Sequence, residues 1–284
     1  GNGTDGLSWD TAYVISGWNI TMENSDGESV VVGDGIDLKN TDRYILIEDC
    51  LFNGSQIPLG ATSIYIGNSS NIRVSNCLTR GLFCVRDSSN IEVNEITFFY
   101  ESSVLNFFNV SRFAIKSCEP LTENDKLGLS VHKGQDGIIS RCTFINPDGG
   151  PTSIDTSENV TVFKNRIDIA DHFYVFLSQD IKILYNEISF SFLPNTLSDS
   201  LIKGNVFVKK ARFELGESTY DNAIYRNAFL GEFSASTSFN VIDNGVNEWS
   251  KNGVGNYWFN YTQQQPGATN NGFVWNSRYT VDPD

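Results

Sequence analysis

A short phrase that returns along most of the chain is the feature that most constrains its fold. The first clear copy is YILIEDCLF at residues 44–52, and eight altered copies follow it. They lie at 72–77, 91–98, 113–118, 137–144, 160–167, 181–188, 200–207 and 222–229. Each copy has an anchor residue near its end, and the anchors are Cys50, Cys77, Ile96, Cys118, Cys142, Asn165, Asn186, Asn205 and Asn227. Successive anchors are 19 to 27 residues apart.

Two positions around the anchor keep their residue type. The third residue before it is always Ile or Val, and the second residue after it is Phe or Ile in seven of nine copies. A repeat of this length with short strands is typical of a β-solenoid, in which coils stack about 4.8 Å apart. We expect both positions to point inward and the anchor to form a bend, because Asn tolerates left-handed backbone angles. An ordinary β-sandwich with evenly spaced strands is the alternative.

The repeat predicts one all-β domain over residues 1–284, because solenoid coils contact only their neighbours. We expect residues 1–35 to form a first coil or cap, with Trp9 and Trp18 as its cover. The coils follow at 36–229. Residues 230–284 are expected to form the last coil and a cap rich in tryptophan (Trp249, Trp258 and Trp275). Such caps protect the open strand edge of the terminal coil.

The composition of the chain argues against some classes of binding partner. The formal net charge is −14, which argues against binding nucleic acid or an anionic membrane through a broad basic face. No apolar run is long enough to span a membrane, and the opening GNGTDGLSW is expected of a mature secreted form rather than a signal peptide. Four of the five cysteines are anchors, which predicts a stack of inward thiols, while Cys84 is expected to point outward.

Seven Asn-x-Ser/Thr sequons suggest a secreted glycoprotein. They begin at Asn2, Asn19, Asn53, Asn68, Asn109, Asn159 and Asn260. The alternative is that they are turns of an Asn- and Ser-rich solenoid.

Both ends of the chain resemble one protein family. The opening GNGTDGLSWDTAYVISGWNI and the closing DNGVNEWSKNGVGNYWFNYTQ are similar to the ends of NosD-like secreted right-handed parallel β-helix proteins, which are abundant in archaea. Ala12 stands where the family's opening motif has proline. The repeats predict roughly ten coils. The resemblance implies that the β-helix is right-handed, as parallel crossovers generally are, and that it lies on or outside an archaeal cell. It implies no particular activity.

The residues do not favour the copper handling implied by the family's name. Copper sites use imidazole and soft sulfur, whereas this chain has only His132, His172, Met22 and mostly inward cysteines. We therefore expect no cofactor. An acidic stretch containing Asp26, Glu28, Asp34 and Asp37 could hold calcium through oxygen ligands, or could be a solvated loop.

Alignment of the coils by their anchors gives a candidate substrate-binding constellation. The tenth residue before the anchor reads Gly67, Arg86, Phe108, His132, Asp155 and Phe176. The twelfth reads Tyr65, Cys84, Asn106, Ser130, Ser153 and Tyr174. Tyr65, Arg86, His132, Asp155 and Tyr174 are therefore the candidate residues, with His132 and Asp155 on adjacent coils. A solvated ion pair is the alternative interpretation of the latter two.

Two functions remain open. The first is a non-catalytic extracellular protein that binds a glycan or builds a surface assembly through its solenoid ends. The second is a polysaccharide lyase or glycoside hydrolase. Hydrolysis uses two carboxyl groups about 5–9.5 Å apart, and the constellation contains only one, so the sequence favours the first function and assigns no catalytic residue.

Overall fold

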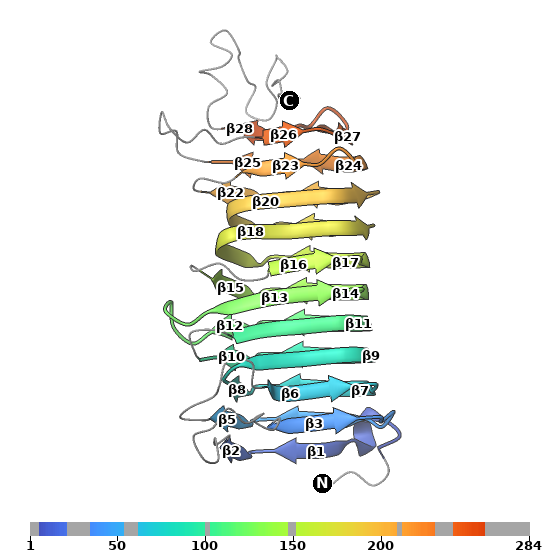
Figure 1. The fold of residues 1–284 in the computed structure, drawn as a ribbon, viewed down its shortest axis with the longest axis vertical. Helices are drawn as coiled ribbons and strands as arrows, with labels where there is room; N and C mark the ends of the chain where they lie inside the picture. Colours follow the sequence, from blue (N-terminus) through green and yellow to red (C-terminus); the bar gives the residue numbers. More distant parts are fainter. Residues whose placement is uncertain are drawn as a thin grey trace, which may run out of the picture. The chain divides into compact units, whose positions relative to one another are not determined.

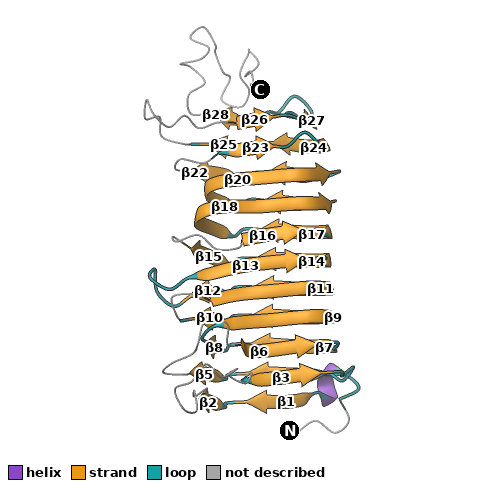
Figure 2. Cartoon of the chain, in the orientation of Figure 1, coloured by secondary structure: helices purple, strands orange, loops and turns teal. Residues whose placement is uncertain are grey.

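The repeated phrase folds into short strands that stack coil on coil (Figures 1 and 2). The structure is a computed structural model and describes residues 6–21, 35–53, 62–99, 103–146, 152–208, 212–230 and 241–258. The chain divides into two units, 1–146 and 147–284, and each is described by itself. Apart from the short helix η1 (Trp9–Thr11), the elements of these described ranges are β-strands.

Three sheets of parallel strands, named here from their order around each coil, form the first unit. The upstream sheet contains β3 (Ile36–Lys39), β6 (Thr62–Gly67), β13 (Leu127–His132) and the first parts of β9 (Leu82–Asn94) and β11 (Ser103–Lys116). The anchor sheet contains β1 (Tyr13–Ser16), β4 (Ile45–Glu48), β7 (Ser70–Ser75), β14 (Gln135–Ser140) and the second parts of β9 and β11. The downstream sheet contains β2 (Asn19–Thr21), β5 (Leu51–Asn53), β8 (Leu78–Thr79), β10 (Thr97–Phe98) and β12 (Glu119–Pro120). β15 (Thr143–Asn146) ends the unit and makes one antiparallel contact with β13.

The second unit repeats this pattern with parallel ladders. Its upstream sheet contains β16 (Thr152–Asp155), β23 (Phe213–Leu215), β26 (Val241–Asp243) and the later parts of β18 (Arg166–Gln179) and β20 (Glu187–Ser198). Its anchor sheet contains β17 (Glu158–Phe163), β19 (Lys182–Leu184), β21 (Leu201–Lys203), β24 (Tyr220–Tyr225) and β27 (Val246–Glu248). β22 (Val206–Val208), β25 (Ala228–Phe229) and β28 (Tyr257–Trp258) follow the anchors, together with the first parts of β18 and β20.

The core of each unit is built from the rows that the repeat predicted. In the first unit Ile47, Val74, Val93, Ile115 and Ile139 lie opposite one another in register, and all are buried. The corresponding row of the second unit is Val162, Ile183, Ile202 and Ile224. The predicted fold class, a parallel β-solenoid, is therefore confirmed. The number of coils differs slightly from the expected ten, and right-handedness stays a prediction.

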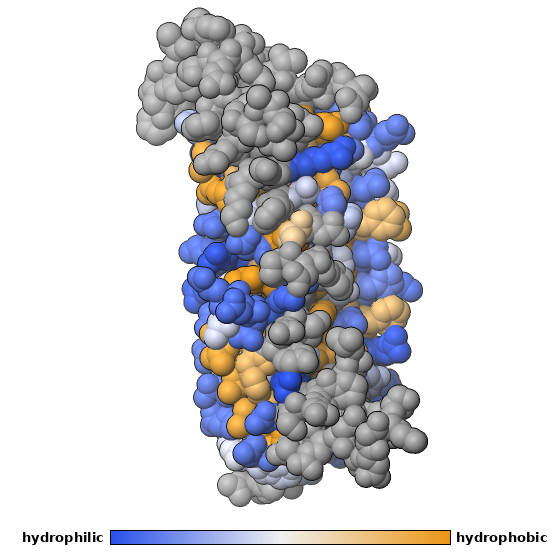
Figure 3. All heavy atoms as spheres, turned by 60° about the vertical axis from the view of Figure 1, so that its left-hand side comes forward, coloured by the Kyte–Doolittle hydropathy of each residue, from blue (hydrophilic) through white to orange (hydrophobic). Residues whose placement is uncertain are grey.

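The outer surface mixes polar and apolar residues. On the face in Figure 3, small groups of hydrophobic residues are interspersed with hydrophilic ones among the described parts of the chain. This mixture is typical of a water-exposed surface, since much of any folded protein's surface is apolar.

The anchor does not take the left-handed conformation that we expected of it. That conformation belongs to the residue before it, with φ between 49° and 58° for every non-glycine example and 70° for Gly204. These residues are Asp49, Asn76, Glu95, Ser117, Arg141, Lys164, Tyr185, Gly204 and Arg226. The reason is geometric: the bend needs one left-handed residue, and the anchor that follows it points into the core.

The anchor side chains instead hydrogen-bond one coil to the next. In the second unit Asn186 Oδ1 accepts hydrogen bonds from the backbone N–H and Nδ2 of Asn165, at 2.8 and 3.0 Å, and Asn186 Nδ2 donates to Val162 O at 2.9 Å. Asn205 and Asn227 repeat the arrangement. In the first unit Cys142 Sγ takes the same place, accepting from Cys118 N–H at 3.5 Å. All five cysteines are thiols, and the four anchors are buried as predicted.

Both end segments contain a further copy of the repeat. Ile15 pairs with Ile47 in the row before the anchors, and Gly17 has the left-handed φ of 71° that precedes an anchor. At the other end Asn256 Oδ1 accepts from Asn227 N–H at 3.0 Å, and Trp258 stacks on Phe229 with 4.2 Å between ring centroids. These copies lie within the segments expected to hold the first coil and the last coil, residues 1–35 and 230–284.

The tryptophans take different places. Trp249 packs against Phe213 and donates from Nε1 to Asp243 Oδ2 at 2.7 Å, whereas Trp275 lies outside the described residues. Trp18 is 57% exposed, and Trp9 packs beside Tyr44 because hydrogen bonds between Gly6 and the backbone hold this turn against the start of β4. Their role as the cover of the first coil stays a prediction.

A polar groove in the first unit as candidate binding site

The bend between the upstream and anchor sheets of the first unit has the same form on successive coils. Four residues make it, and the first and the fourth are left-handed. The bends are Asn68 to Asn71, Asp87 to Asn90, Asn109 to Arg112 and Lys133 to Asp136. Asn and Asp suit these positions because they adopt left-handed angles more readily than other side chains.

A buried serine in the bend fixes its shape. Ser69 Oγ donates to Gly67 O at 2.8 Å, and Ser88 Oγ donates to Arg86 O at 2.7 Å. The same Ser88 Oγ accepts the backbone N–H of Ser69 at 3.1 Å, which links one coil to the next. The hydroxyl therefore satisfies backbone groups that the bend removes from the strand ladder.

The stacked bends of the first unit form an open groove of about 710 Å³. Its lining consists of amides, hydroxyls, carboxylates and one lysine, with Val110 as the apolar member. The lining residues are Asn40, Thr41, Asp42, Asn68, Ser69, Ser70, Asp87, Ser88, Ser89, Asn109, Val110, Ser111, Lys133 and Gln135. The volume is within the range of small-molecule sites, but those sites are mostly apolar, so this groove suits a polar ligand.

Hydrogen bonds between coils hold the outer side chains of the groove in place. Asn68 Nδ2 donates to Asn40 Oδ1, and Asn109 Nδ2 donates to Asp87 Oδ1, each at 2.7 Å. The amides thus form ordered pairs along the groove. Asn68, Asp87 and Asn109 are all exposed, so their polar groups are accessible from the groove.

The predicted site residues of the first unit lie next to this groove. Arg86, Phe108 and His132 occupy one row in register, as the alignment predicted. The Arg86 guanidinium lies 4.9 Å from the centroid of the Phe108 ring, and the His132 imidazole stacks on that ring with centroids 4.9 Å apart. Phe108 therefore brings Arg86 and His132 together. Tyr65 pairs with Cys84 in the neighbouring row, and Lys39 Nζ lies 4.9 Å from its ring centroid.

The predicted site residues of the second unit, Asp155 and Tyr174, lie on the paired strands β16 and β18. Asp155 pairs with Phe176 and accepts a hydrogen bond from Thr156 Oγ1 at 2.8 Å. Tyr174 pairs with Ser153, and its ring lies 5.1 Å from that of His172. Because His132 belongs to the first unit and Asp155 to the second, their predicted adjacency stays a prediction.

Two of the sequons coincide with the groove. Asn68 and Asn109 line it, and they are exposed, as are Asn19, Asn53 and Asn159. Asn2 and Asn260 lie outside the described residues. The groove was missed from the sequence, although the tetrapeptides NSSN (68–71) and DSSN (87–90) were a visible sign of it.

The two carboxylates of the groove lie on different coils. Asp42 lies between β3 and β4, and Asp87 lies on β9. The coil of β6 and β7 stands between them, so their backbones are two coil steps apart, about 9.6 Å along the stack. The two residues also occupy different positions in their bends. On the coil between them, Asp42 lies opposite Ser70, whereas Asp87 lies opposite Asn68. The backbone spacing of the two residues is therefore close to the upper end of the roughly 5–9.5 Å between the carboxyl groups of glycosidases.

The described ranges contain no group of three or more His, Cys, Asp or Glu side chains placed to hold a metal ion. Of the acidic stretch suggested for calcium, Asp26, Glu28 and Asp34 lie outside those ranges, and Asp37 forms an ion pair with Lys39 at 2.6 Å. Met22 is also outside them. Within the same ranges, no helix has the length and apolar character to cross a membrane.

Comparisons with known proteins identify similar folds. No protein-family model matches the sequence, and no curated protein matches it. Among solved structures the chain is similar to PfbA, a surface adhesin of Streptococcus pneumoniae, with 16% identity and a TM-score of 0.44 over 76% of this chain and 65% of that chain. It is also similar to a GH136 lacto-N-biosidase from Eubacterium ramulus, with 7% identity and a TM-score of 0.37 over 88% of this chain and 58% of the other.

The chain thus spans less than two thirds of the length of either structure. The class defined by the ladders themselves is a parallel β-helix protein, here with a polar groove along the bends of its first unit.

Proposed function

We propose that this protein is a non-catalytic, extracellular or cell-surface β-helix protein that binds a glycan in the groove of its first unit. The observation that carries the proposal is the polar row that runs without interruption from Asn40 through Asn68, Asp87 and Asn109 to Lys133. One set of hydrogen-bonding groups recurs at each coil, about 4.8 Å apart. A glycan likewise presents hydroxyl groups at a regular spacing along an extended chain.

Charge favours a glycan over other long polymers. The net charge of −14 opposes nucleic acid, whose binding depends on neutralising phosphates. Among the groove residues, Asp42 and Asp87 are acidic and Lys133 is basic, so the lining is close to balanced. Amide, hydroxyl and carboxylate groups that are already ordered lose little conformational freedom when they bind a sugar hydroxyl.

The surface location and the NosD-like, archaeal assignment rest on the two end segments and on the sequons.

Glycosylation and ligand binding are alternatives at Asn68 and Asn109, because a glycan attached to either Nδ2 would occupy the groove. We therefore propose modification at Asn19, Asn53, Asn159 or Asn260 rather than at these two. Glycopeptide mapping of the native protein tests this, and occupied Asn68 or Asn109 would contradict the groove proposal.

The alternative function is a polysaccharide lyase or glycoside hydrolase. It is favoured by the stacking of Arg86 and His132 on Phe108, which places a cation and an imidazole beside the groove. Release of new reducing ends or of unsaturated sugars from a bound polysaccharide, lost in Arg86→Gln and His132→Gln, would establish it. Binding without any product supports the non-catalytic function.

Ser89→Trp tests glycan binding directly. Ser89 is in the centre of the groove lining, and an indole there would fill the space of a ligand. Gln179→Trp is the matched control, because Gln179 is the equivalent third residue of the bend from Leu177 to Asp180 in the second unit. We expect immobilised polysaccharides to retain the wild type and the control, and Ser89→Trp to bind at least about tenfold more weakly. No retention on any polysaccharide, or unchanged binding by Ser89→Trp, would overturn the proposal.

A further inference from the structure

A second hollow of about 300 Å³ lies on the outer face of the anchor sheet in the first unit. Its lining includes the small side chain of Ala114 together with Trp9, Arg73, Glu92, Arg112 and Lys116. Ala114 pairs with Glu92 on one neighbouring strand and with Ile138 on the other, and Glu92 pairs with Arg73 on the next strand. The short alanine side chain leaves the gap in a row of longer ones.

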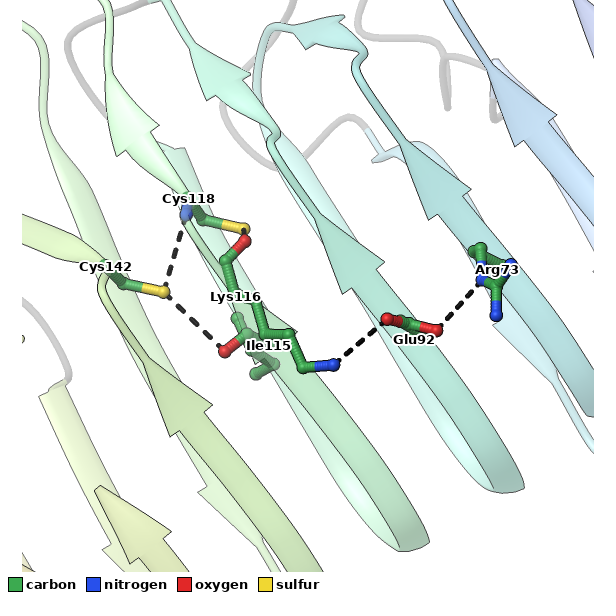
Figure 4. Close-up of polar contacts among 6 residues, drawn as sticks. All are labelled: Arg73, Glu92, Ile115, Lys116, Cys118 and Cys142. Atoms are coloured by element: carbon green, nitrogen blue, oxygen red, sulfur yellow. Dashed lines mark hydrogen bonds and ion pairs between the residues drawn. The ribbon is translucent and has the colours of Figure 1, made fainter. Parts of the chain in front are cut away.

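Glu92 organises two of the cations around this gap. One of its carboxylate oxygens accepts from Arg73 Nε at 2.9 Å and the other accepts from Lys116 Nζ at 3.1 Å, as Figure 4 shows. Partial burial acts to raise the pKa of Glu92, but the hydrogen bonds and charges of Lys116 and Arg73 outweigh it and hold the pKa below its ordinary value. Glu92 is therefore ionised at neutral pH and keeps both cations in place.

The cations retain hydrogen-bonding capacity. Arg73 uses only Nε for Glu92, and its guanidinium lies 4.4 Å from the Trp9 ring centroid, which fixes its plane. Its two Nη groups have no hydrogen-bond acceptor among the described residues. Arg112 uses Nη2 for a long contact with Ser89 Oγ at 3.5 Å. Three cations thus face two carboxylates, those of Glu92 and Asp136, around the hollow, which gives a local positive excess in a chain of net charge −14.

The hollow adjoins the groove. Asn90, Arg112 and Asp136 line the hollow, and each is the fourth residue of a bend whose earlier residues line the groove. The contact between Arg112 and Ser89 joins the two sites directly. A polymer lying in the groove therefore has its substituents within reach of the cations.

We propose that this hollow binds the carboxylate group of an acidic polysaccharide, one containing uronic acids, whose chain lies in the groove; the inference rests on the proposed function. A planar carboxylate matches the paired N–H groups of a guanidinium, and such bidentate contacts are stronger than neutral hydrogen bonds. The hollow has less than half the volume of the groove, so it suits a single acidic sugar unit rather than a length of chain. It therefore supplies charge specificity to a groove that otherwise recognises hydroxyl groups.

The test compares polygalacturonate, its methyl ester and dextran as ligands, measured by calorimetry at fixed ionic strength. Arg112→Gln removes one cation from an exposed position, and Ala114→Leu fills the hollow without a change in charge. Arg226→Gln is the matched control, since Arg226 is also exposed and left-handed but lies in the second unit. We expect the wild type and the control to bind the acid at least tenfold more tightly than the ester. We expect both hollow variants to reduce that preference to less than about twofold while leaving ester binding unchanged.

The outcomes separate the two proposals. Equal binding of acid and ester by the wild type would retain the groove and overturn the hollow. Equal losses in Arg226→Gln and Arg112→Gln would show a diffuse charge effect and would also overturn the hollow. Binding of dextran sulfate with the same dependence on Arg112 would show a general anion site and overturn the assignment to carboxylates. If none of the polysaccharides binds, both proposals fail.

Discussion

Glu92 is the residue on which the outer charges of the anchor sheet depend, because it pairs with Arg73 and Lys116 on the two sides of its strand. All three side chains are partly exposed, so the pairs contribute modestly to stability. We expect Glu92→Gln to lower the free energy of unfolding by about 0.5–1 kcal/mol at neutral pH.

The direction of the pKa shift gives this effect a pH dependence. A carboxyl group whose pKa is lowered in the folded state contributes stability above its unfolded pKa, and this contribution is lost as the pH falls through the folded value. Urea denaturation should therefore show a deficit for Glu92→Gln at pH 7 that disappears well below the ordinary value of 4.5. A deficit of equal size at about pH 3 would show that packing, and not charge, is responsible.

The anchor thiols are expected to be unreactive in the folded protein. Burial raises the pKa of Cys77 to about 12, and burial together with the neighbouring Cys142 raises the pKa of Cys118 well above its ordinary value. Thiolates, not thiols, react with disulfide reagents. At about pH 8 we expect at most one rapid reaction, at the half-buried Cys84, and five after denaturation. Rapid reaction of two or more thiols in the folded protein would disprove the buried stack.

The sequence predicted the buried rows but not the backbone of the bends, for a physical reason. Positions such as Ile47 and Val74 are recognisable because the core accepts only a few side chains. The left-handed residue before the anchor points outward, so Asp49, Ser117 and Tyr185 all occupy it. The left-handed conformation costs roughly 1–2 kcal/mol per residue, and the stacked coils impose it whatever the side chain. The position therefore has no common residue type by which it could be recognised in the sequence.

The ladder of asparagines is the element that links the coils of the second unit. Asn205→Ala would leave the Asn186 N–H and the Ile183 carbonyl without their partners in a buried place. Each unsatisfied group costs about 1–3 kcal/mol, so we expect a loss of at least about 2–3 kcal/mol in the free energy of unfolding.

Asn205→Cys is the matched comparison, because cysteine fills the same position in the first unit and Cys142 Sγ accepts the corresponding N–H there. We expect this variant to lose clearly less than Asn205→Ala in urea denaturation. Equal losses for both variants would mean that the volume of the side chain, and not its acceptor, matters at the anchor.

The groove and the hollow could be predicted only in part. The bend sequences from Asn68 and Asp87 were visible, but a groove arises only when bends of equal shape are stacked in register. The hollow depends on Ala114 lying two strands from Arg73 and beside Glu92. An alanine among longer outward side chains has no signature in a single sequence, because its effect comes from neighbours about 20 residues away in the chain.

At the scale of the whole molecule, the organisation into one domain stays a prediction, as does right-handedness. The repeat itself supports one domain, since the phrase continues from Cys142 to Asn165 with the usual spacing on both sides of residue 146. The end segments are also repeat copies, at Ile15 to Trp18 and at Asn256 to Trp258. The solenoid pattern therefore continues into both end segments, where a first coil and a last coil were expected.

The last described coil covers the core of the coil before it, and its removal should make the protein associate. Deleting residues 245–284 removes β27 and β28, which pair in parallel with β24 and β25, and removes Trp258 from the face of Phe229. Burial of a large aromatic contributes about 2–3 kcal/mol, and the unpaired edges of β24 and β25 would become templates for other chains. We expect oligomers by light scattering and a lower melting temperature.

The shorter deletion of 259–284 keeps Trp258 and Asn256 and so isolates the contribution of this coil. A deletion of 245–284 that stays monomeric with an unchanged melting temperature would show that the edge of β24 and β25 is protected in another way.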